Sequence, residues 1–326
     1  MRPRIAHNAA MYEVSDQSGR LAVITGSNSG LGKEAARRLA AAGARVLLAV
    51  RSVASGEQAR DAILGEFPGA SVEVGRVDLA SLASVKDFAD GLLAEGTQVD
   101  LLLNNAGLMA VPARMTTVDG FELQFATNFL GPFALTLRLL PLLLAAPAPR
   151  VVTMSSTAAR FGRIQLDDLQ AEHGYRPMRA YGQSKLADLM FARRLAGIAA
   201  DRGWRLVSNA AHPGYTRTNL ITSGAALRQP GSRRLAMHVL SRIPHPAQGV
   251  RIGAEPLLYA ATSPDAVNGG YYGPQGPLEL AGPAGFARVP QHARDADVAA
   301  RLWSVAEQLT GVTLPRESGG SSAGAL

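Results

Sequence analysis

The chain has 326 residues, of which 47% are apolar and 18% charged, so it is long enough for one large domain or two small ones and its composition argues against disorder. It contains no cysteine, which excludes disulfides, thiolate zinc sites and a cysteine nucleophile, and no metal site is predicted. The formal net charge is +7, but the arginines that carry most of it are scattered along predicted helices without a basic arm, which argues against a nucleic-acid partner.

From residue 20 onward, short β-rich runs alternate with longer helical patterns. Strands are predicted at Leu21–Thr25, Arg45–Val50, Ser71–Arg76, Val99–Asn104, Arg150–Ser155, Arg205–Ala210 and Gly270–Tyr272. Helices are predicted near 30–42, 55–67, 81–95, 117–144, 179–202, 246–262 and 295–310. Several of the strands are almost unbroken apolar runs, which is typical of parallel strands buried on both faces. The alternation predicts a doubly wound, mostly parallel seven-stranded sheet in a three-layer α/β/α Rossmann fold.

Interruptions of this pattern indicate the domain organisation. Residues 1–18 are polar and without period, and they are predicted to form an N-terminal arm. Residues 19–312 are predicted to form a single domain with substrate-loop insertions near 162–178 and 219–245, followed by a flexible tail over 313–326. No run of about 18 apolar residues predicts a membrane span, and the N-terminus lacks an apolar signal core. We therefore expect a cytoplasmic protein.

A glycine-rich turn joins the first predicted strand to the first predicted helix. It reads Thr25, Gly26, Ser27, Asn28, Ser29, Gly30, Leu31 and Gly32. Its glycines let the backbone turn sharply and approach a pyrophosphate closely, and the helix N-terminus adds free N–H groups. The spacing departs from Gly-x-Gly-x-x-Gly, so a plain glycine-rich turn is the alternative. The order of strand, turn and helix favours a dinucleotide site.

The end of the second predicted strand indicates which dinucleotide is bound. An NAD site usually has an acidic residue there, about 20 residues further on, to hold the ribose 2′-hydroxyl. This chain has Arg51 and Ser52 instead, which could pair with and hydrogen-bond a 2′-phosphate. A solvated arginine at a strand end is the alternative. The pattern favours NADP(H).

Two further strand ends carry residues that fit such a site. Asp78 and Leu79 follow the third strand, where the aspartate could meet the adenine amino group or could equally cap the next helix. Small and polar residues end the fourth strand: Asn104, Asn105, Ala106 and Gly107. Ligands lie at the carboxyl ends of strands in open α/β sheets. A structural role in tying adjacent strands is an equal alternative for Asn104.

A tyrosine and a lysine four residues apart lie near the start of the helix predicted at 179–202. Tyr181 and Lys185 share one helix face, so the phenol and the ammonium can address one ligand. A phenol is a poor base near neutral pH, but a neighbouring ammonium and an oxidised nicotinamide both favour the phenolate. Tyr181 is therefore predicted to exchange a proton with a carbonyl or alcohol oxygen, while Lys185 also holds the nicotinamide ribose.

Three more polar residues are candidates for the same site. Ser155 and Ser156 follow the fifth strand, where a hydroxyl can hydrogen-bond the substrate oxygen beside Tyr181. Serines at strand ends also serve only to terminate strands. Asn128 is an awkward residue for mid-helix, and its side chain could support a water next to Lys185, although an incidental position is an equal alternative.

Together these residues resemble the short-chain dehydrogenase/reductase superfamily over roughly residues 18–310. The resemblance rests on the turn at 25–32, Asn105-Ala106-Gly107, Asn128, Ser156, Tyr181-x-x-x-Lys185 and Pro213-Gly214-x-x-x-Thr218. It implies a catalytic tetrad of Asn128, Ser156, Tyr181 and Lys185, with Ser155 as the alternative to Ser156. It also implies that the nicotinamide and the phosphates are bound by Pro213, Gly214, Thr216 and Thr218, and that the protein is a homodimer or homotetramer.

A closer similarity is to the retinol dehydrogenase and WW-domain oxidoreductase branch. It is carried by Val50-Arg51-Ser52, the run from Asn104 to Met109, the segment Phe161–Leu169 and His212-Pro213-Gly214. Ser156 and Tyr181 are 25 residues apart, about a dozen more than is usual in the superfamily, and this branch shares that spacing. His212 is interpreted as structural, because Tyr181 already supplies the acid–base group. We expect no N-terminal anchor like that of the vertebrate membrane members, and this expectation counts against a retinoid substrate.

The two predicted insertions mix apolar residues with arginines. The arginines are Arg163, Arg176, Arg228, Arg233 and Arg234. This composition predicts a mostly apolar substrate, such as an aromatic, terpenoid, polyketide-like or long-chain ketone or aldehyde, with room for an anionic tail. We expect an NADP(H)-dependent oxidoreductase that interconverts a carbonyl and an alcohol, in a direction that the sequence does not set. The alternatives are NAD-dependent alcohol oxidation and an NADP(H)-binding sensor without turnover.

Overall fold

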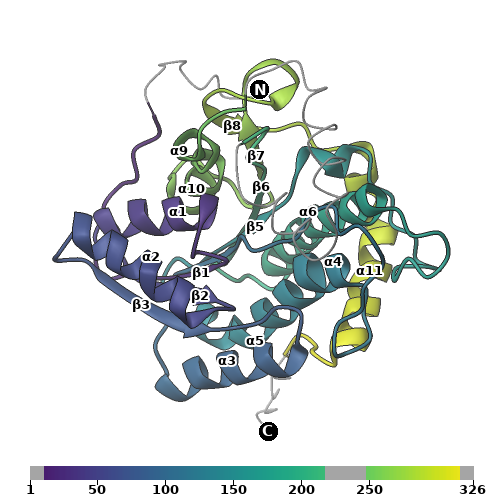
Figure 1. Ribbon diagram of the computed structural model, residues 1–326, viewed down its shortest axis with the longest axis horizontal. Helices are drawn as coiled ribbons and strands as arrows, with labels where there is room; N and C mark the ends of the chain where they lie inside the picture. The colour runs from purple at the N-terminus through teal and green to yellow at the C-terminus, as the bar shows by residue number, and fades with distance from the viewer. Residues whose placement is uncertain (1–10, 217–246, 316–326) are drawn as a thin grey trace, which may run out of the picture.

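The computed structural model describes residues 11–216 and 247–315 (Figure 1). The first ten residues of the predicted arm, the insertion at 219–245 and most of the predicted tail lie outside the described residues. Thr218 of the predicted cofactor site and three of the predicted substrate-loop arginines, Arg228, Arg233 and Arg234, also lie outside them.

The described residues form one sheet of eight strands. The strands are β1 Leu21–Thr25, β2 Arg45–Val50, β3 Ser71–Arg76, β4 Leu101–Asn104, β5 Arg150–Met154, β6 Val207–Ala211, β7 Tyr271–Pro274 and β8 Ala284–Phe286. Their order across the sheet is β3-β2-β1-β4-β5-β6-β7-β8, and every neighbouring pair is parallel except β7 with β8. The doubly wound, mostly parallel fold is therefore confirmed.

The predicted strand count was one too low, because β8 is not in the prediction. Its three residues, Ala-Gly-Phe, lie in a stretch rich in glycine and proline and show no alternation that would indicate a strand. The strand forms because it pairs antiparallel with the edge strand β7, with Tyr272 opposite Phe286 and Pro274 opposite Ala284. The two rings also pack together, with centroids 5.1 Å apart. Tertiary pairing thus decided an element that local sequence did not.

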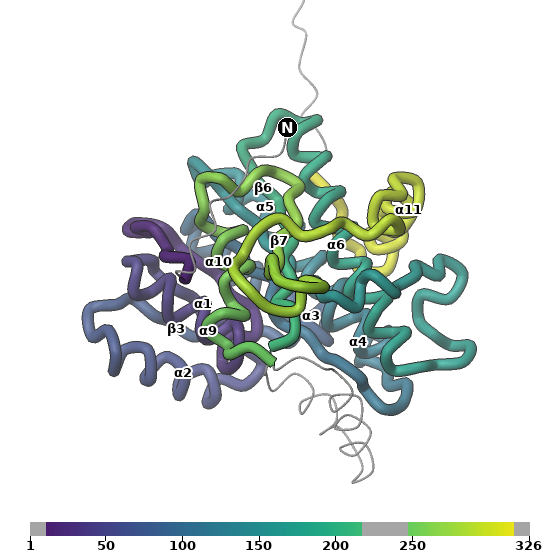
Figure 2. The backbone as a smooth tube through the Cα atoms, turned by 90° about the horizontal axis from the view of Figure 1, so that it is seen from above, coloured from purple at the N-terminus to yellow at the C-terminus, as the bar shows by residue number. Residues whose placement is uncertain are grey.

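Helices cover both faces of the sheet and give the three predicted layers. They are α1 Gly30–Ala41, α2 Val53–Glu66, α3 Leu82–Glu95, α4 Leu123–Phe125, α5 Gly131–Ala145, α6 Pro177–Asp201, α9 Val250–Gly253, α10 Glu255–Thr262 and α11 Ala296–Thr310. One hydrophobic core packs α1, α2 and α10 on the sheet, and the other packs α3, α5, α6 and α11 on its opposite face. Figure 2 shows α1, α2 and α10 on one side and α4, α6 and α11 on the other.

The helix predicted over 117–144 starts later and is not uniform. The chain first makes a turn closed by a bridge between Thr116 and Glu122. The Glu122 carboxylate then caps α4 by accepting the N–H groups of Gln124 and Phe125 at 3.0 and 2.6 Å. A π-helical turn, η1, follows at Ala126–Leu130 and leads into α5. The prediction started the helix too early because the turn residues carry no proline or other strong helix breaker apart from Gly120.

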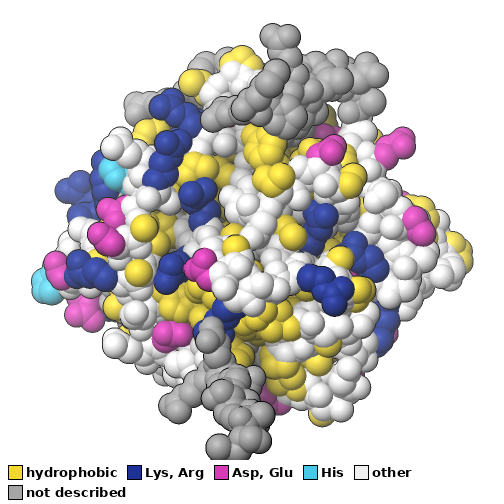
Figure 3. Space-filling model, turned by 180° about the vertical axis from the view of Figure 1, so that it is seen from behind, with side chains coloured by type: hydrophobic (Ala, Val, Ile, Leu, Met, Phe, Trp, Pro, Cys, Tyr) yellow, Lys and Arg dark blue, Asp and Glu magenta, His cyan; other side chains and the backbone are white. Residues whose placement is uncertain are grey.

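The run Leu123–Ala145 is long and apolar enough to cross a membrane, although no such segment was predicted. Of its most apolar 18-residue window, 78% is buried inside the protein, as in a core helix. On the surface, Figure 3 shows Lys and Arg side chains spread over the rear face of the described part and interspersed with acidic and apolar ones.

Candidate active site

The predicted site residues that the structure describes gather at the carboxyl ends of the parallel strands. β1 lies between β2 and β4, so the chain leaves β1 and β4 toward opposite sides of the sheet. In open α/β sheets the crevice at this reversal is where ligands bind. The glycine-rich turn follows β1, the Asn-Asn-Ala-Gly segment follows β4, and the segments after β5 and β6 continue the same edge.

The glycine-rich turn is packed against the loop after β4. Gly26 has a φ of +64°, and a Cβ there would lie 2.9 Å from Cα of Ala106. A Cβ on Gly32 would lie 2.6 Å from the carbonyl oxygen of Gly26 and 2.4 Å from Nδ2 of Asn105. These glycines are therefore required by backbone packing as well as by any ligand. Ser29 precedes α1 in an extended conformation and makes no side-chain cap, so the first N–H groups of α1 stay available to an anion.

Thr25 and Asn105 join this turn to β4. The Thr25 hydroxyl accepts the N–H groups of Asn105 and Ala106, both at 3.0 Å, and Nδ2 of Asn105 donates to the Thr25 carbonyl at 2.9 Å. Asn104 points the other way, and its Nδ2 donates to the hydroxyl of Thr136 on α5 at 2.9 Å. Asn104 thus has a structural contact, from strand to helix rather than between adjacent strands.

Arg51 and Ser52 lie on the surface after β2. Arg51 is exposed and forms no ion pair with any residue in 11–216 or 247–315. Ser52 caps α2 by accepting the N–H of Ser55 at 3.4 Å. A solvated arginine and a guanidinium free for an incoming phosphate both fit this position, so the predicted 2′-phosphate contact stays a prediction.

Asp78 forms a local turn at the end of β3. Its Oδ1 accepts the N–H of Ala80 at 3.0 Å, and its own N–H donates to the hydroxyl of Ser84 at 2.9 Å. Helix α3 is capped by Ser81, whose hydroxyl accepts the N–H of Ser84 at 3.3 Å. The interpretation of Asp78 as the cap of this helix was therefore wrong, because the helix begins one turn later than that interpretation required. Leu79 is buried.

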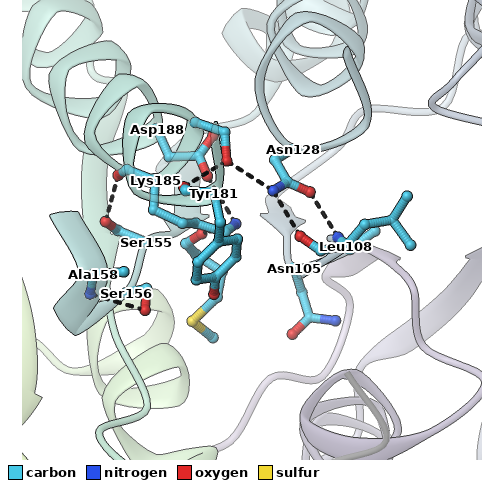
Figure 4. Close-up of polar contacts among 12 residues, drawn as sticks. Asn105, Leu108, Asn128, Ser155, Ser156, Ala158, Tyr181, Lys185 and Asp188 are labelled. Atoms are coloured by element: carbon cyan, nitrogen blue, oxygen red, sulfur yellow. Dashed lines mark hydrogen bonds and ion pairs between the residues drawn. The ribbon is translucent and has the colours of Figure 1, made fainter. Parts of the chain in front are cut away.

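Tyr181 and Lys185 lie near the N-terminal end of α6 and are both buried, with exposed fractions of 4% and 3%. Figure 4 shows the phenol of Tyr181 extending away from α6, with Ser156 on one side and Asn105 on the other. The Lys185 ammonium donates to the carbonyl oxygen of Met154 at 2.9 Å and to Oδ2 of Asp188 at 2.8 Å. The phenol and the ammonium thus stand together at the end of β5, as the spacing predicts.

The structure distinguishes the two serines after β5. Ser155 is buried, and its hydroxyl donates to the carbonyl oxygen of Lys185 at 2.7 Å, so it ties β5 to α6. Ser156 is half-buried and accepts the N–H of Ala158 at 3.2 Å at the start of the short helix η2, Thr157–Arg160. No acceptor among the described residues takes the proton of the Ser156 hydroxyl, which favours Ser156 over Ser155 as the substrate contact.

Asn128 lies in the π-helical turn and is fully engaged. Its Oδ1 accepts the N–H of Leu108 at 2.7 Å, while its Nδ2 donates to the Leu108 carbonyl at 3.0 Å and to the Ser184 hydroxyl at 2.8 Å. A Cβ on Gly107 would lie 3.1 Å from Oδ1 of Asn128 and 3.4 Å from Nζ of Lys185. Asn128 therefore links the loop after β4 to α6, and its position is not incidental. A water relay through it stays a prediction.

The segment after β6 is held by a buried histidine. His212 accepts the N–H of Gly214 at Nδ1 over 3.2 Å, and its Nε2 lies 3.0 Å from Oε2 of Glu279. Burial lowers the pKa of His212, so its ring is neutral near pH 7 and carries its proton on Nε2 toward the carboxylate. The Thr216 hydroxyl donates to the Pro213 carbonyl at 2.7 Å. These contacts agree with the structural interpretation of His212.

The residues of the site match a known family. The sequence model of the short chain dehydrogenase family matches residues 20–226. The chain belongs to the short-chain dehydrogenase family. It is 38% identical over 301 residues to polyprenol dehydrogenase of Mus musculus, covering 90% of this chain and 85% of that protein. It is 37% identical over 297 residues to retinol dehydrogenase 12 of Homo sapiens, covering 90% and 87%.

Solved structures of similar proteins share the fold of this short-chain dehydrogenase. A protein from Mycobacterium paratuberculosis is 40% identical, with a TM-score of 0.76 over 93% of this chain and 98% of that one. The RhlG–NADP complex of Pseudomonas aeruginosa is 25% identical, with a TM-score of 0.61 over 80% and 96%. The predicted superfamily and the similarity to retinol dehydrogenases are confirmed, and with them an oxidoreductase that uses a nicotinamide cofactor.

Sequence reasoning missed one charged residue at the edge of this dehydrogenase's site, Glu279. Besides His212, its carboxylate forms an ion pair with Arg160 and accepts the N–H of Arg288 at 2.9 Å. Arg160 also donates to the carbonyl oxygen of Leu278 at 3.0 Å. Leu278 and Glu279 have φ values of +56° and +58°, which side chains rarely adopt. Glu279 thus ties the segment after Ser156 to the segment after β6, and no sequence motif signals it.

Proposed function

We propose that this short-chain dehydrogenase is an NADP(H)-dependent enzyme that interconverts a carbonyl and an alcohol on a mostly apolar substrate. The observation that carries the proposal is the burial of Tyr181 beside Lys185 at the strand ends, next to a Ser156 hydroxyl whose proton has no acceptor in the part of the chain that the structure describes. This donor set suits a reaction in which an oxygen atom gains or loses a proton. The cofactor supplies the chemistry of hydride transfer when it is bound.

The residues at the strand ends fit such a cofactor. The glycines of the turn let its backbone pack directly against the loop after β4. The Ser29 side chain does not cap α1, which leaves the first N–H groups of this helix for a pyrophosphate. Gly107 lies close to both Asn128 and Lys185, so a side chain there would occupy the space beside the ammonium. We assign the turn at 26–32, Asn105, Ala106 and Gly107 to cofactor binding, together with the Pro213–Thr216 segment.

In this mechanism Tyr181 holds the mobile proton. During reduction its hydroxyl donates that proton to the carbonyl oxygen, and during oxidation its phenolate takes the proton from the alcohol. The Lys185 ammonium favours the phenolate form, and the Ser156 hydroxyl donates a hydrogen bond to the substrate oxygen and orients it. Burial of Tyr181 and Lys185 keeps bulk water from competing for these hydrogen bonds.

The preference for NADP(H) is supported by the surface after β2. A guanidinium without an ion-pair partner in the described chain, next to a hydroxyl, suits a phosphate better than a ribose hydroxyl. Positions 51 and 52 carry no acidic residue of the kind that holds the ribose 2′-hydroxyl in an NAD site. We therefore assign these two residues to the 2′-phosphate, and Asp78 and Leu79 to the adenine side.

An apolar substrate is supported by exposed side chains that follow the catalytic elements. Phe161 and Leu278 are 86% and 72% exposed, and the hydrogen bond from Arg160 to the Leu278 carbonyl holds their two segments side by side. Met178, at the start of α6, is 46% exposed. The polyprenol and retinol of the relatives' names are also long, mostly apolar alcohols. The cytoplasmic location and the homodimer or homotetramer stay predictions.

The proposal is tested by cofactor titration followed by a turnover screen. NADPH and NADH are titrated into purified protein and followed by fluorescence, and apolar aldehydes, ketones and alcohols are then screened with the tighter cofactor. We expect NADPH to bind at least about tenfold tighter and at least one apolar carbonyl compound to be reduced. Binding of NADPH without turnover of any compound, and a Tyr181→Phe variant with unchanged properties, would favour a sensor instead.

A further inference from the structure

The Lys185 ammonium is committed to the protein on one side and borders the candidate cofactor site on the other. It carries three N–H donors. One goes to the Met154 carbonyl at 2.9 Å and one to Oδ2 of Asp188 at 2.8 Å. Within the described residues the third has no acceptor, and Gly107 lies close to that nitrogen, because a Cβ there would be 3.4 Å from it. Asp188 therefore decides how one of the three donors is used.

Asp188 is fully buried, three residues after Lys185 on α6. Burial raises the pKa of its carboxyl to about 6, and the Lys185 ammonium acts in the opposite direction. Its second oxygen, Oδ1, is buried without a hydrogen-bond partner among the described residues. The other elements that pack against α6 are β5, β6, α4, η1, η2, α11 and the short helix η4, Gln291–Arg294. From none of them does a further charged or titratable side chain that the structure describes act on this carboxyl.

Packing alone does not explain an aspartate at this position. An amide or apolar side chain of similar size would avoid the cost of removing a carboxylate from water. What an aspartate adds is a negative charge 2.8 Å from the ammonium. On the other side of Lys185, one helical turn earlier, lies Tyr181 (Figure 4). The Lys185 ammonium thus has a carboxylate on one side and the Tyr181 side chain on the other.

We propose that Asp188 is a positioning residue of the active site, which fixes the Lys185 ammonium, offsets its charge and so sets the pH range in which Tyr181 exchanges its proton. This inference rests on the proposed function, in which Tyr181 is the acid and base. An ammonium paired with a carboxylate stabilises a nearby phenolate less than an unpaired ammonium does. A neutral side chain at position 188 favours the phenolate, and alcohol oxidation then persists to lower pH.

The first test is the pH dependence of alcohol oxidation with NADP⁺ and an apolar alcohol from the turnover screen. In Asp188→Asn the midpoint of the acidic limb of kcat/KM is expected to shift down by roughly one pH unit. The matched control is Asp201→Asn, which removes the same charge from an exposed position at the far end of α6. The control is expected to keep the wild-type midpoint. An Asp188→Asn midpoint equal to that of the control overturns the inference.

The second test needs no turnover and follows the tyrosinate absorbance of the protein without cofactor. Subtracting the Tyr181→Phe spectra, in the wild-type and in the Asp188→Asn background, isolates the signal of Tyr181. That signal is expected to appear roughly one pH unit lower in Asp188→Asn. An inactive wild type would contradict the proposed function, whereas an unmoved tyrosinate signal contradicts the role of Asp188.

A folding defect is controlled by circular dichroism and by a second variant. Asp188→Ser also removes the charge and keeps a small oxygen acceptor for Lys185, so it is expected to shift both midpoints in the same direction. If neither variant folds, Asp188 is required for the structure itself, and the positioning role is overturned.

Discussion

The two ends of the candidate site are held by different kinds of contact. At the end that we assign to the adenosine, Arg51 and Ser52 are exposed, and the contacts of Ser52 and Asp78 reach only two to six residues along the chain. At the nicotinamide end most of the side chains are buried, and several of them also reach partners far away in sequence. Asn128 reaches a residue 56 positions away, and His212 one that is 67 positions away.

This difference separates specificity from architecture. An exposed side chain with local contacts can be exchanged at little cost in folding free energy, so the adenosine end can be changed without disturbing the fold. A buried side chain that joins two distant segments cannot, because its removal leaves a polar partner without a hydrogen bond. We therefore expect substitutions at the adenosine end to alter binding alone, and most substitutions at the nicotinamide end to alter stability as well.

Tyr181→Phe is expected to break this rule and to have the largest effect. The phenol oxygen has no hydrogen bond to a described residue, so the variant should stay within about 1 kcal/mol of the wild-type unfolding free energy. Its kcat should fall by roughly 10³-fold, because the acid–base group is lost. Steady-state kinetics, cofactor titration and thermal unfolding measure the three quantities. Activity above one tenth of the wild type would argue against the assignment of Tyr181.

Gly32→Ala tests whether the glycine-rich turn belongs to the architecture. The new methyl group would lie 2.6 Å from the Gly26 carbonyl oxygen, so the turn must shift, at a cost of about 1–3 kcal/mol, and NADPH binding should weaken with it. The matched control is Gly91→Ala on α3, where nothing lies within 4 Å of the added Cβ. That change should stabilise the protein by about 0.5–1 kcal/mol. Equal effects at the two positions in chemical denaturation would show that the turn is not tightly packed.

Arg51→Ala tests the adenosine end directly. We expect the variant to bind NADPH about tenfold more weakly and NADH unchanged, because one charge-assisted hydrogen bond is worth about 1.5–3 kcal/mol at most. Its unfolding free energy should equal that of the wild type. Arg60→Ala, on the adjacent helix α2, removes the same charge and should leave the cofactor preference intact. A preference that survives in Arg51→Ala would make this arginine a surface charge only.

Glu279→Gln tests the nicotinamide end, and its expected effect is the smallest of the four. Burial acts to raise the pKa of Glu279. The hydrogen bonds from His212 and the Arg288 N–H and the charge of Arg160 act to lower it and together outweigh burial, so the pKa of Glu279 is lowered. A carboxylate with a lowered pKa stabilises the fold above its ordinary value of 4.5, and this contribution is lost as the pH falls through the lowered value. The variant should therefore be about 1 kcal/mol less stable at pH 7, and the difference should vanish in acid.

Denaturant unfolding across this pH range measures the effect of Glu279→Gln. Asp188 titrates in the same way in both proteins, so its contribution cancels in the difference. His212 is coupled to Glu279, because the carboxylate acts to raise the pKa of the ring, so the measured difference belongs to the His212–Glu279 pair. Glu73→Gln is the control, because Glu73 pairs with Arg45 at 2.8 Å on the surface and is half exposed. It should cost less than about 0.5 kcal/mol at any pH. A Glu279→Gln difference that does not change with pH would show that its carboxylate is not stabilised by these partners.

Local patterns in the sequence determined most of the elements and half of the site. Leu21–Thr25, Arg45–Val50 and Ser71–Arg76 are predicted with the bounds that the structure has, because short β-rich runs bounded by turns carry their own signal. Tyr181 and Lys185 were recognisable for the same reason, since one turn of one helix brings them together. The glycine-rich turn is equally local.

Tertiary structure alone decided the rest. The strand β8 exists only because β7 offers an edge, and the π-helical turn at Asn128 forms where its side chain bridges Leu108 and Ser184. Glu279 meets His212 across 67 residues. Such contacts are set by the packing of distant segments, whose pairing no window of sequence contains. The sequence thus determined the fold class and the reacting pair, and the packed chain decided which polar groups surround that pair and stay free for a ligand.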